Sequence, residues 1–124
     1  MDAKPISVLL VDDDQDTQTM IHAVMDHYHY HFVVANDAQE AIDYLTHNAT
    51  DIVLLDIYLP DRNGYDTLKI IRNDTRSQAK IIAITAYYTD ETPTEMINRG
   101  FDGYLPKPLS PTELGPYIQN LLTN

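Results

Sequence analysis

Six side chains that could take part in metal or phosphate chemistry stand at or just after the ends of apolar segments in this chain of 124 residues. They are Asp12, Asp13, Asp14, Asp56, Thr85 and Lys107. If the segments are neighbouring parallel strands, these side chains meet at one edge of a sheet, where ligands bind in such folds. Carboxylates about 5 Å apart repel one another by roughly 3 kcal/mol per pair at an effective dielectric near 20. Such a cluster therefore needs a counter-charge.

Lys107 can supply one positive charge, and a hard divalent cation with oxygen ligands, for which Mg²⁺ is the natural candidate, can supply the rest. Such a cation also holds phosphate oxygens and offsets the charge of a phosphoryl group in transfer. The Thr85 hydroxyl and the Lys107 ammonium are donors that this group would need. We therefore predict phosphoryl chemistry at this edge, although Asp14 is equally well explained as a cap of the next helix.

Strands and helices are predicted in alternation. Apolar segments rich in β-branched residues predict strands over 6–11, 32–35, 52–55, 81–84 and, more briefly, 104–105. Several are continuous rather than alternating, which is typical of strands buried on both faces of a parallel sheet. Apolar side chains recur at helical spacing in four segments between them: Ile21, Val24, Met25 and Tyr28; Ala38, Ala41, Ile42 and Leu45; Leu68 and Ile71; and Met96 and Ile97. The pattern predicts one doubly wound α/β domain over residues 1–124.

Boundary signals mark the last two helices. Pro93 predicts the start of the fourth helix and Gly100 its end. The segment 110–113 (SPTE) predicts a fifth helix with a capping box and a proline at its first position. Pro116 follows soon after and would cost about 3 kcal/mol in a regular helix. We therefore expect a kink, a displaced helix start or a split first turn.

Composition and charge restrict the classes of function. Nineteen acidic and eight basic residues give a formal charge of −11, which repels nucleic-acid backbones, so we expect no direct nucleic-acid binding. No apolar run approaches the roughly 18 residues of a membrane span, and no basic-then-apolar signal begins the chain. The absence of cysteine agrees with a reducing cytoplasm. We expect a cytoplasmic protein whose partners present basic or apolar surface.

Four segments resemble one known family. They are residues 9–13 (LLVDD), 51–64 (DIVLLDIYLPDRNG), 84–86 (ITA) and 103–108 (GYLPKP). Together they look like the CheY-like receiver domain of two-component response regulators, and the resemblance covers the whole chain with its motifs in order. It implies a (βα)5 three-layer sandwich whose five-stranded parallel sheet has the flavodoxin-like order 2-1-3-4-5.

The resemblance also implies roles for the acidic residues. Asp56 would accept a phosphoryl group from a phosphohistidine on a sensor histidine kinase or histidine phosphotransfer protein. Asp12, Asp13 and Asp56 would hold Mg²⁺ together with the backbone carbonyl of Tyr58. Lys107 would pair with Asp56 and later with the phosphoryl oxygens. A domain of this kind is not an enzyme in the usual sense, beyond self-phosphorylation from small donors and slow self-dephosphorylation.

A switch is implied as well. Thr85 would reorient toward the phosphoryl group and Tyr104 would turn inward, so that added charge changes a surface. The face made by helix four, strand five and helix five would then bind a downstream protein. The 107–108 peptide bond would be cis, and Gly64 would form a turn after the phosphorylated loop. Because Pro116 lies in helix five, we expect docking that differs from the family's usual dimer. Tyr104 is also compatible with an ordinary half-buried aromatic residue.

Tyr58 and Tyr87 occupy the positions two residues after the phosphoacceptor and two after the switch hydroxyl, with Tyr88 adjacent. In the family, residues at these positions influence how water reaches the acyl phosphate. Two large rings there would exclude the attacking water, so we hypothesise slow self-dephosphorylation. The alternative is that the rings only face solvent.

Other readings compete with this one. Asp12 and Asp14 form an Asp-x-Asp after a first strand, which is superficially similar to phosphohydrolases of the haloacid dehalogenase type, but the late acidic pair of that family is missing. A pure interaction module is disfavoured because the phosphorylation residues are intact. The spacing of His27, His29 and His31 matches no standard set of metal ligands, so we interpret them as loop residues. Both a stand-alone regulator and a receiver excised from a longer protein fit the sequence.

Overall fold

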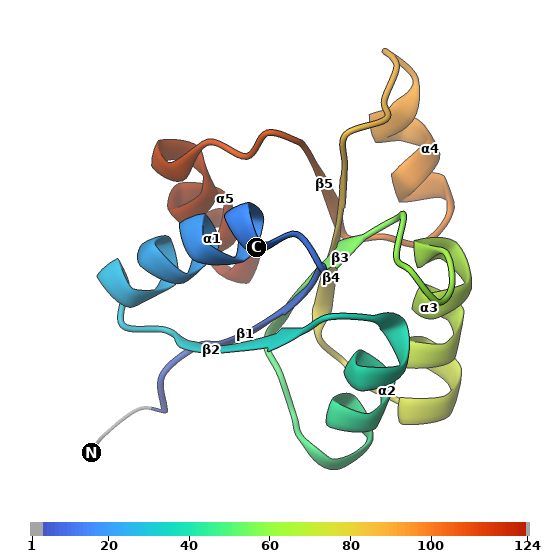
Figure 1. Cartoon of the computed structure of the whole chain (residues 1–124), viewed down its shortest axis with the longest axis horizontal. Coiled ribbons are helices and arrows are strands. Elements are labelled where there is room, and N and C mark those ends of the chain that lie inside the picture. The colour runs from blue at the N-terminus through green and yellow to red at the C-terminus, as the bar shows by residue number, and fades with distance from the viewer. Residues whose placement is uncertain (1–3, 124) are drawn as a thin grey trace.

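The computed structural model describes residues 4–123, which alternate between strands and helices (Figure 1). The elements are β1 (Ser7–Val11), α1 (Gln15–His27), β2 (His31–Ala35), α2 (Ala38–His47), β3 (Ile52–Asp56), α3 (Gly64–Ile70), a π-helical turn η1 (Ile71–Thr75), β4 (Lys80–Thr85), α4 (Thr92–Asn98), β5 (Gly103–Pro106) and α5 (Pro111–Thr123). The predicted strands are confirmed, with ends that differ by one or two residues. Within the described residues, none of the helices combines the length and apolar character that crossing a membrane requires.

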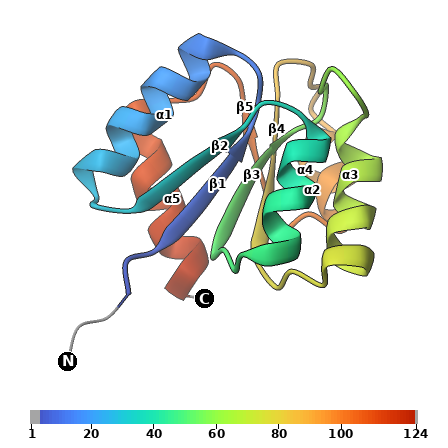
Figure 2. The same ribbon diagram turned by 60° about the horizontal axis from the view of Figure 1, so that its bottom comes forward.

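All five strands are parallel and form one sheet in the order β2-β1-β3-β4-β5. Figure 2 shows α1 and α5 on one face of this sheet and α2, α3 and α4 on the other. The predicted three-layer sandwich and the predicted strand order are therefore confirmed. Because every strand runs the same way, the residues that end β1, β3, β4 and β5 all reach the same edge of the sheet.

Alternate residues of each central strand enter two separate apolar cores. In β1, Leu9 and Val11 pack with α2, α3 and α4, whereas Val8 and Leu10 pack with α1 and α5. Residues of β3 and β4 divide in the same way. These strands are buried on both faces, which explains why their sequences are continuously apolar rather than alternating.

Side chains in the preceding loops cap three of the helices. Asp14 caps α1 by accepting the N–H of Thr17, Asp37 caps α2, and Asn63 caps α3. Each cap satisfies an N–H that has no partner inside the helix. Asp14 thus takes the capping role that the sequence left open. After the carboxyl end of α4, Gly100 has a φ of +105°, a conformation that favours glycine. The predicted end of the fourth helix at Gly100 is confirmed.

The start of α5 differs from the predicted capping box. Pro111 is the first helical residue, as predicted. The N–H of Glu113, however, donates to the carbonyl of Ser110 at 3.1 Å, while the Ser110 hydroxyl lies 3.1 Å from that of Thr112. The Glu113 N–H therefore bonds to the Ser110 carbonyl and not to the Ser110 hydroxyl, which contacts Thr112 instead. The predicted capping box is wrong.

Pro116 neither displaces the start of α5 nor splits its first turn. The helix runs without interruption through the proline. Leu114 and Ile118 are buried in the core shared with α1. Burying two such side chains contributes about 1.5–3 kcal/mol each, which offsets the roughly 3 kcal/mol that an internal proline costs. These two expected outcomes are wrong because packing outweighs the lost hydrogen bond. A kink at Pro116 stays a prediction.

One arginine connects the segments that lead into β4 and β5. The guanidinium of Arg72 donates to the carbonyl of Ala79 at 2.6 Å and pairs with the carboxylate of Asp102 at 2.7 Å. Asp102 also accepts the N–H of Ile81 at 2.8 Å. The amino ends of the two strands are therefore held by the same pair of side chains.

Candidate functional site

Three carboxylates meet at the carboxyl edge of the sheet. Asp12 and Asp13 follow β1, and Asp56 is the last residue of the neighbouring strand β3. One oxygen from each lies within 4.8 Å of the others. Asp12 is fully buried and Asp56 is 6% exposed, whereas Asp13 faces solvent. The predicted cluster therefore forms, with two of its charges removed from water.

Lys107 supplies the counter-charge within the cluster. Its Nζ lies 2.7 Å from Oδ2 of Asp12 and 3.1 Å from Oδ2 of Asp56. The backbone N–H of Lys107 donates to the carbonyl of Thr85 at 2.9 Å, which ties the segment after β5 to the end of β4. The peptide bond between Lys107 and Pro108 is cis, as predicted.

The electrostatics leave the cluster short of positive charge. Three carboxylates and one ammonium carry a formal charge of −2. Burial raises the pKa of Asp56, and the charge of Asp12 adds to this, while Lys107 opposes it. Burial alone would lower the pKa of Lys107, but its hydrogen bond to Asp12 and the charge of Asp56 outweigh burial and raise it. The site thus favours an added cation.

Asp56 is held at both oxygens. Its Oδ1 accepts the N–H of Tyr58 at 3.2 Å, and its Oδ2 accepts from Lys107. The loop that follows doubles back closely. Gly64 donates to the carbonyl of Ile57 at 2.7 Å, and a Cβ on Gly64 would lie 2.9 Å from the carbonyl oxygen of Asp56. Glycine is required here for this close approach rather than for an unusual φ.

Thr85 ends β4 and is 1% exposed. Its hydroxyl accepts the N–H of Tyr87 at 3.1 Å and donates to the Tyr87 carbonyl at 3.5 Å. The hydroxyl is therefore engaged by the loop after β4. Asp56 pairs in register with Ile84, the residue before Thr85, so Thr85 lies on the strand beside the carboxylate cluster.

Tyr104 lies on β5 and packs half-buried against the core. Its hydroxyl is buried and has no hydrogen-bond partner among the described residues. Burial raises the pKa of this phenol, as does the nearby Tyr88. The backbone N–H of Tyr104 donates to the hydroxyl of Tyr117 on α5 at 3.0 Å. The ring thus occupies an inward position, and α5 contacts its backbone.

The rings of Tyr58 and Tyr87 meet edge to face, with centroids 4.9 Å apart. They belong to the loops after β3 and β4, so their contact joins these loops beside the carboxylate cluster. The two rings are 60% and 73% exposed. Each therefore contacts the other on one side and solvent on the rest.

Asp61 has a role that the sequence reasoning missed. Its carboxylate accepts the N–H groups of Ala38 and Gln39, at 2.9 and 3.0 Å, and so caps α2 from the loop after β3. Burial alone would raise the pKa of Asp61, but these two N–H bonds lower it. No local signal could have revealed this contact, because Asp61 lies 23 residues from the helix start it caps.

The three closely spaced histidines do not form a site. His27 ends α1, His29 adopts a positive φ of 59° in the following turn, and His31 begins β2. Within residues 4–123, the group of side chains suited to a metal ion is Asp12, Asp13 and Asp56. The interpretation as loop residues is confirmed for His29 and is wrong for His27 and His31, which are the last residue of α1 and the first residue of β2.

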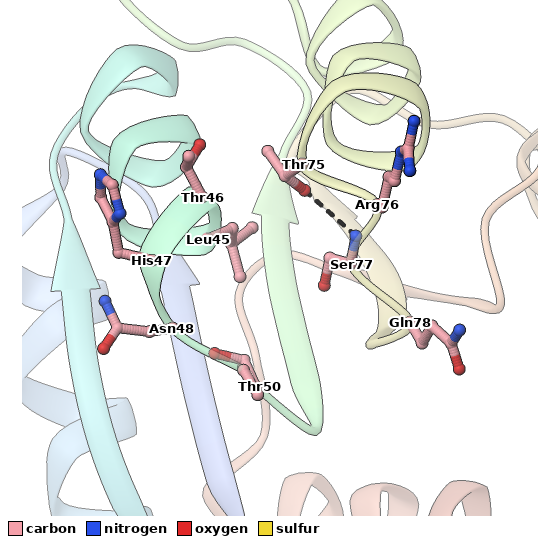
Figure 3. Close-up of a pocket in the computed structure, with 10 residues that line it drawn as sticks. Leu45, Thr46, His47, Asn48, Thr50, Thr75, Arg76, Ser77 and Gln78 are labelled. Carbon is pink, nitrogen blue, oxygen red and sulfur yellow. Dashed lines mark hydrogen bonds between the residues drawn. The ribbon is translucent and has the colours of Figure 1, made fainter.

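A separate hollow of about 380 Å³ lies at the opposite, amino edge of the sheet (Figure 3). It lies between the end of α2, near Leu45, and the turn that leads into β4, where the Thr75 hydroxyl accepts the N–H of Ser77 at 3.2 Å. Arg76 adopts a left-handed conformation in that turn, with φ of 58°.

Comparisons with known proteins agree with this fold. A family profile described as the response regulator receiver domain matches residues 8–119. The transcriptional regulatory protein CpxR of Escherichia coli K12 is 34% identical over 115 residues, which are 93% of this chain and 48% of CpxR. This chain belongs to the family of response regulator receiver domains. It spans about half the length of the curated relatives it matches.

Solved structures show the same relationship. A CheY-like receiver domain protein from Methanospirillum hungatei has a TM-score of 0.86 and 28% identity, covering 97% of this chain and 95% of its own. The receiver domain of sensor histidine kinase PA1611 from Pseudomonas aeruginosa, determined with a magnesium ion in its active site cleft, has a TM-score of 0.84 and 28% identity. That match covers 98% of this chain and the whole of the other. Receiver domains generally bind Mg²⁺ at an acidic cluster, and Asp12, Asp13 and Asp56 form one here.

Proposed function

We propose that this receiver domain, taking up residues 1–124, accepts a phosphoryl group on Asp56 from a phosphohistidine of a sensor histidine kinase or a histidine phosphotransfer protein. An Asp56 carboxylate oxygen attacks the phosphorus, and a P–O bond forms as the P–N bond breaks. The imidazole nitrogen keeps the electron pair and takes up a proton from water. The product is an acyl phosphate on Asp56.

The observation that carries this proposal is the setting of Asp56. It is nearly buried at the end of β3, within 4.8 Å of two further carboxylates and 3.1 Å from Lys107. Burying carboxylates of this kind destabilises the fold unless positive charge, from a lysine or a bound cation, compensates them. We expect Lys107, which pairs with Asp56 in the unmodified protein, to pair with the phosphoryl oxygens after transfer.

The residues present fit a magnesium ion. The donors are hard carboxylate oxygens, and the cluster has a formal charge of −2 with its lysine included. Asp12, Asp13, Asp56 and the backbone carbonyl of Tyr58 would hold the ion. When bound, it offsets negative charge on the phosphoryl oxygens and so lowers the barrier to attack.

The switch would begin at Thr85. Its hydroxyl bonds to the Tyr87 backbone in the unmodified protein. A phosphoryl group on Asp56 offers charged acceptor oxygens nearby, and we expect the hydroxyl to leave Tyr87 for this stronger partner. The loop after β4 would then lose an anchor, and Tyr104 would respond on the neighbouring strand. The face of α4, β5 and α5 would bind the downstream protein.

The partners are expected to be proteins. A formal charge of −11 opposes direct nucleic-acid binding by this domain and favours partners with basic or apolar surface. We expect the domain to work in the cytoplasm, where histidine kinases present their phosphohistidine. Beyond accepting phosphoryl groups, including those from small donors, and losing them slowly, we expect no enzymatic activity.

The proposal can be tested by incubation with acetyl phosphate and Mg²⁺, followed by intact-mass measurement. We expect a gain of one phosphoryl group in the native protein and none in Asp56→Asn. Asp43→Asn, which removes an exposed carboxylate from α2, is the matched control and should be modified normally. Modification that persists in Asp56→Asn, or no modification of a folded native protein by any donor, would contradict the proposal.

A further inference from the structure

A hollow of about 540 Å³ lies beside the Tyr58–Tyr87 contact, with lining residues from α3 and α4. Four tyrosines line it: Tyr58, Tyr65, Tyr87 and Tyr88. Its volume is in the range of pockets that bind small ligands, roughly 300–1,000 Å³. We refer to these four residues and the space between them as the tyrosine hollow.

The tyrosine hollow concentrates the exposed apolar side chains of the described chain. Tyr58, Tyr87 and Tyr88 are 60%, 73% and 51% exposed, and the other large apolar residue of comparable exposure among residues 4–123 is Ile97. Exposed apolar side chains that occur singly need no explanation, but a contiguous group of them is typical of an interaction site. The edge-to-face contact of Tyr58 with Tyr87 also holds these rings in place before any partner arrives.

The charge around the tyrosine hollow is negative. Glu95 lines it, and Asp90 and Glu91 are exposed between two of its lining residues. The nearby cation is Arg99, whose guanidinium pairs with Glu95 at 3.5 Å. Residues 87–99 thus carry three acidic side chains and one basic side chain. An anionic ligand would be repelled, whereas a cation would be attracted.

One ring of the hollow already binds a guanidinium within the molecule. The Arg99 guanidinium carbon lies 3.9 Å from the centroid of Tyr65. Aromatic faces attract such cations by about 0.5–1 kcal/mol at exposed sites and by about 2 kcal/mol when water is excluded. Tyr58, Tyr87 and Tyr88 offer further aromatic surface of the same kind in the same hollow.

We propose that the tyrosine hollow is a docking site for an arginine or lysine side chain of a partner protein. The aromatic rings would contact the cation and its methylene groups, and the acidic residues of α4 and its preceding loop would supply the complementary charge. This binding does not require phosphorylation of Asp56, so the inference stands or falls separately from the phosphoryl transfer proposed above.

The test is an NMR titration of the unphosphorylated protein with the peptide acetyl-Gly-Arg-Gly-amide. We expect saturable shifts confined to the tyrosine hollow, with a Kd of about 1 mM, as befits a single side chain. The isosteric citrulline peptide, which lacks the charge, should bind at least about fivefold more weakly. Tyr88→Ala should weaken binding of the arginine peptide by a similar factor, and binding should weaken as salt is added.

Ile97→Ala is the matched control, because it removes an exposed apolar side chain from α4 that does not line the hollow. It should bind the arginine peptide as the native protein does. Equal binding of the citrulline peptide, shifts centred elsewhere, no saturation, or equal losses in Ile97→Ala and Tyr88→Ala would each overturn the proposal. Self-association that Tyr88→Ala abolishes would also overturn it, because a second copy of the chain would then be the occupant.

Discussion

The hydroxyl of Tyr117 accepts the backbone N–H of Tyr104 at 3.0 Å, and thereby joins helix α5 to the edge strand β5. A Cβ on Gly103 would collide with that hydroxyl, so the glycine makes room for the contact. Pro106, at the end of the strand, has no N–H to offer. The open edge of the sheet is therefore left with fewer free donors, which reduces the risk of pairing with another chain.

We predict that Tyr117→Phe destabilises the domain by about 1 kcal/mol, because the Tyr104 N–H loses its acceptor. Urea unfolding measures the change. Tyr44→Phe is the control, since it removes the hydroxyl of another half-buried tyrosine, on α2, that is remote from β5. Equal losses in the two variants would show that the contact with Tyr104 contributes nothing particular.

Asp56→Asn should stabilise the metal-free protein at pH 7. Burial raises the pKa of Asp56 in the folded state, so the folded protein holds this proton more tightly than the unfolded chain does. The protein is therefore more stable when Asp56 is protonated, and this stability is lost as pH rises through the folded pKa. The amide has no charge to ionise and avoids this cost. Urea unfolding with a chelator present gives the comparison, with Asp43→Asn as the control. A less stable Asp56→Asn variant would refute the expectation.

Lys107→Met should have the opposite effect and destabilise the protein by about 3 kcal/mol, since it leaves the fully buried Asp12 without its cation. Mg²⁺ should restore part of the loss by supplying positive charge at the same place. Thermal unfolding with and without Mg²⁺ measures both effects. Lys69→Met, on the exposed side of α3, serves as control and should change little. If Lys107→Met unfolds at the native temperature, the ion pair does not hold the cluster together.

Asp61 should contribute to acid sensitivity. Its pKa is lowered by the N–H groups of Ala38 and Gln39, so its contribution is present above its ordinary pKa of 3.8 and is lost as pH falls through the lower folded value. We expect Asp61→Asn to be less stable at neutral pH and to show a flatter decline in acid. Unfolding midpoints from pH 7 to pH 2 test this, with Asp26→Asn on α1 as the comparison. Parallel curves for native protein and Asp61→Asn would contradict the assignment.

Tyr58→Asn and Tyr87→Glu should shorten the lifetime of the acyl phosphate by about tenfold each, equivalent to about 1.4 kcal/mol in the barrier. The paired rings stand beside the site, and their replacement by small polar groups would admit or orient water. Intact-mass measurements at successive times after removal of the donor report the decay. Tyr88→Ala is the control, because its ring is not part of the pair. Unchanged decay in both variants would mean that the rings only face solvent.

The sequence was sufficient for the parts of the fold and site that depend on strand ends. Continuous apolar segments identify buried parallel strands, and the rule that ligands bind at their carboxyl edge brings Asp12, Asp56 and Lys107 together without knowledge of coordinates. Helix caps with local partners, such as Asp14 with Thr17, could also be predicted from the sequence, because donor and acceptor are three residues apart.

Contacts between distant segments could not be predicted in this way. Asp61 caps a helix from another loop, and Tyr117 meets a strand that precedes it by 13 residues. The bonds of the Thr85 hydroxyl to Tyr87 depend on loop geometry rather than on residue type. Local rules also failed where packing decided the outcome, as in the uninterrupted helix around Pro116.

Arg72 and Asp102 join the amino ends of β4 and β5, whereas the residues proposed to respond to phosphorylation, Thr85 and Tyr104, lie further along the same strands. The carboxyl ends of the same strands are joined as well, because the N–H of Lys107 donates to the carbonyl of Thr85. The two strands are therefore tied to each other at both ends, and we expect a displacement beside Asp56 to move them together instead of sliding one strand past the other. The register of the sheet would survive each signalling cycle, and recovery of the resting state would need no re-pairing of strands.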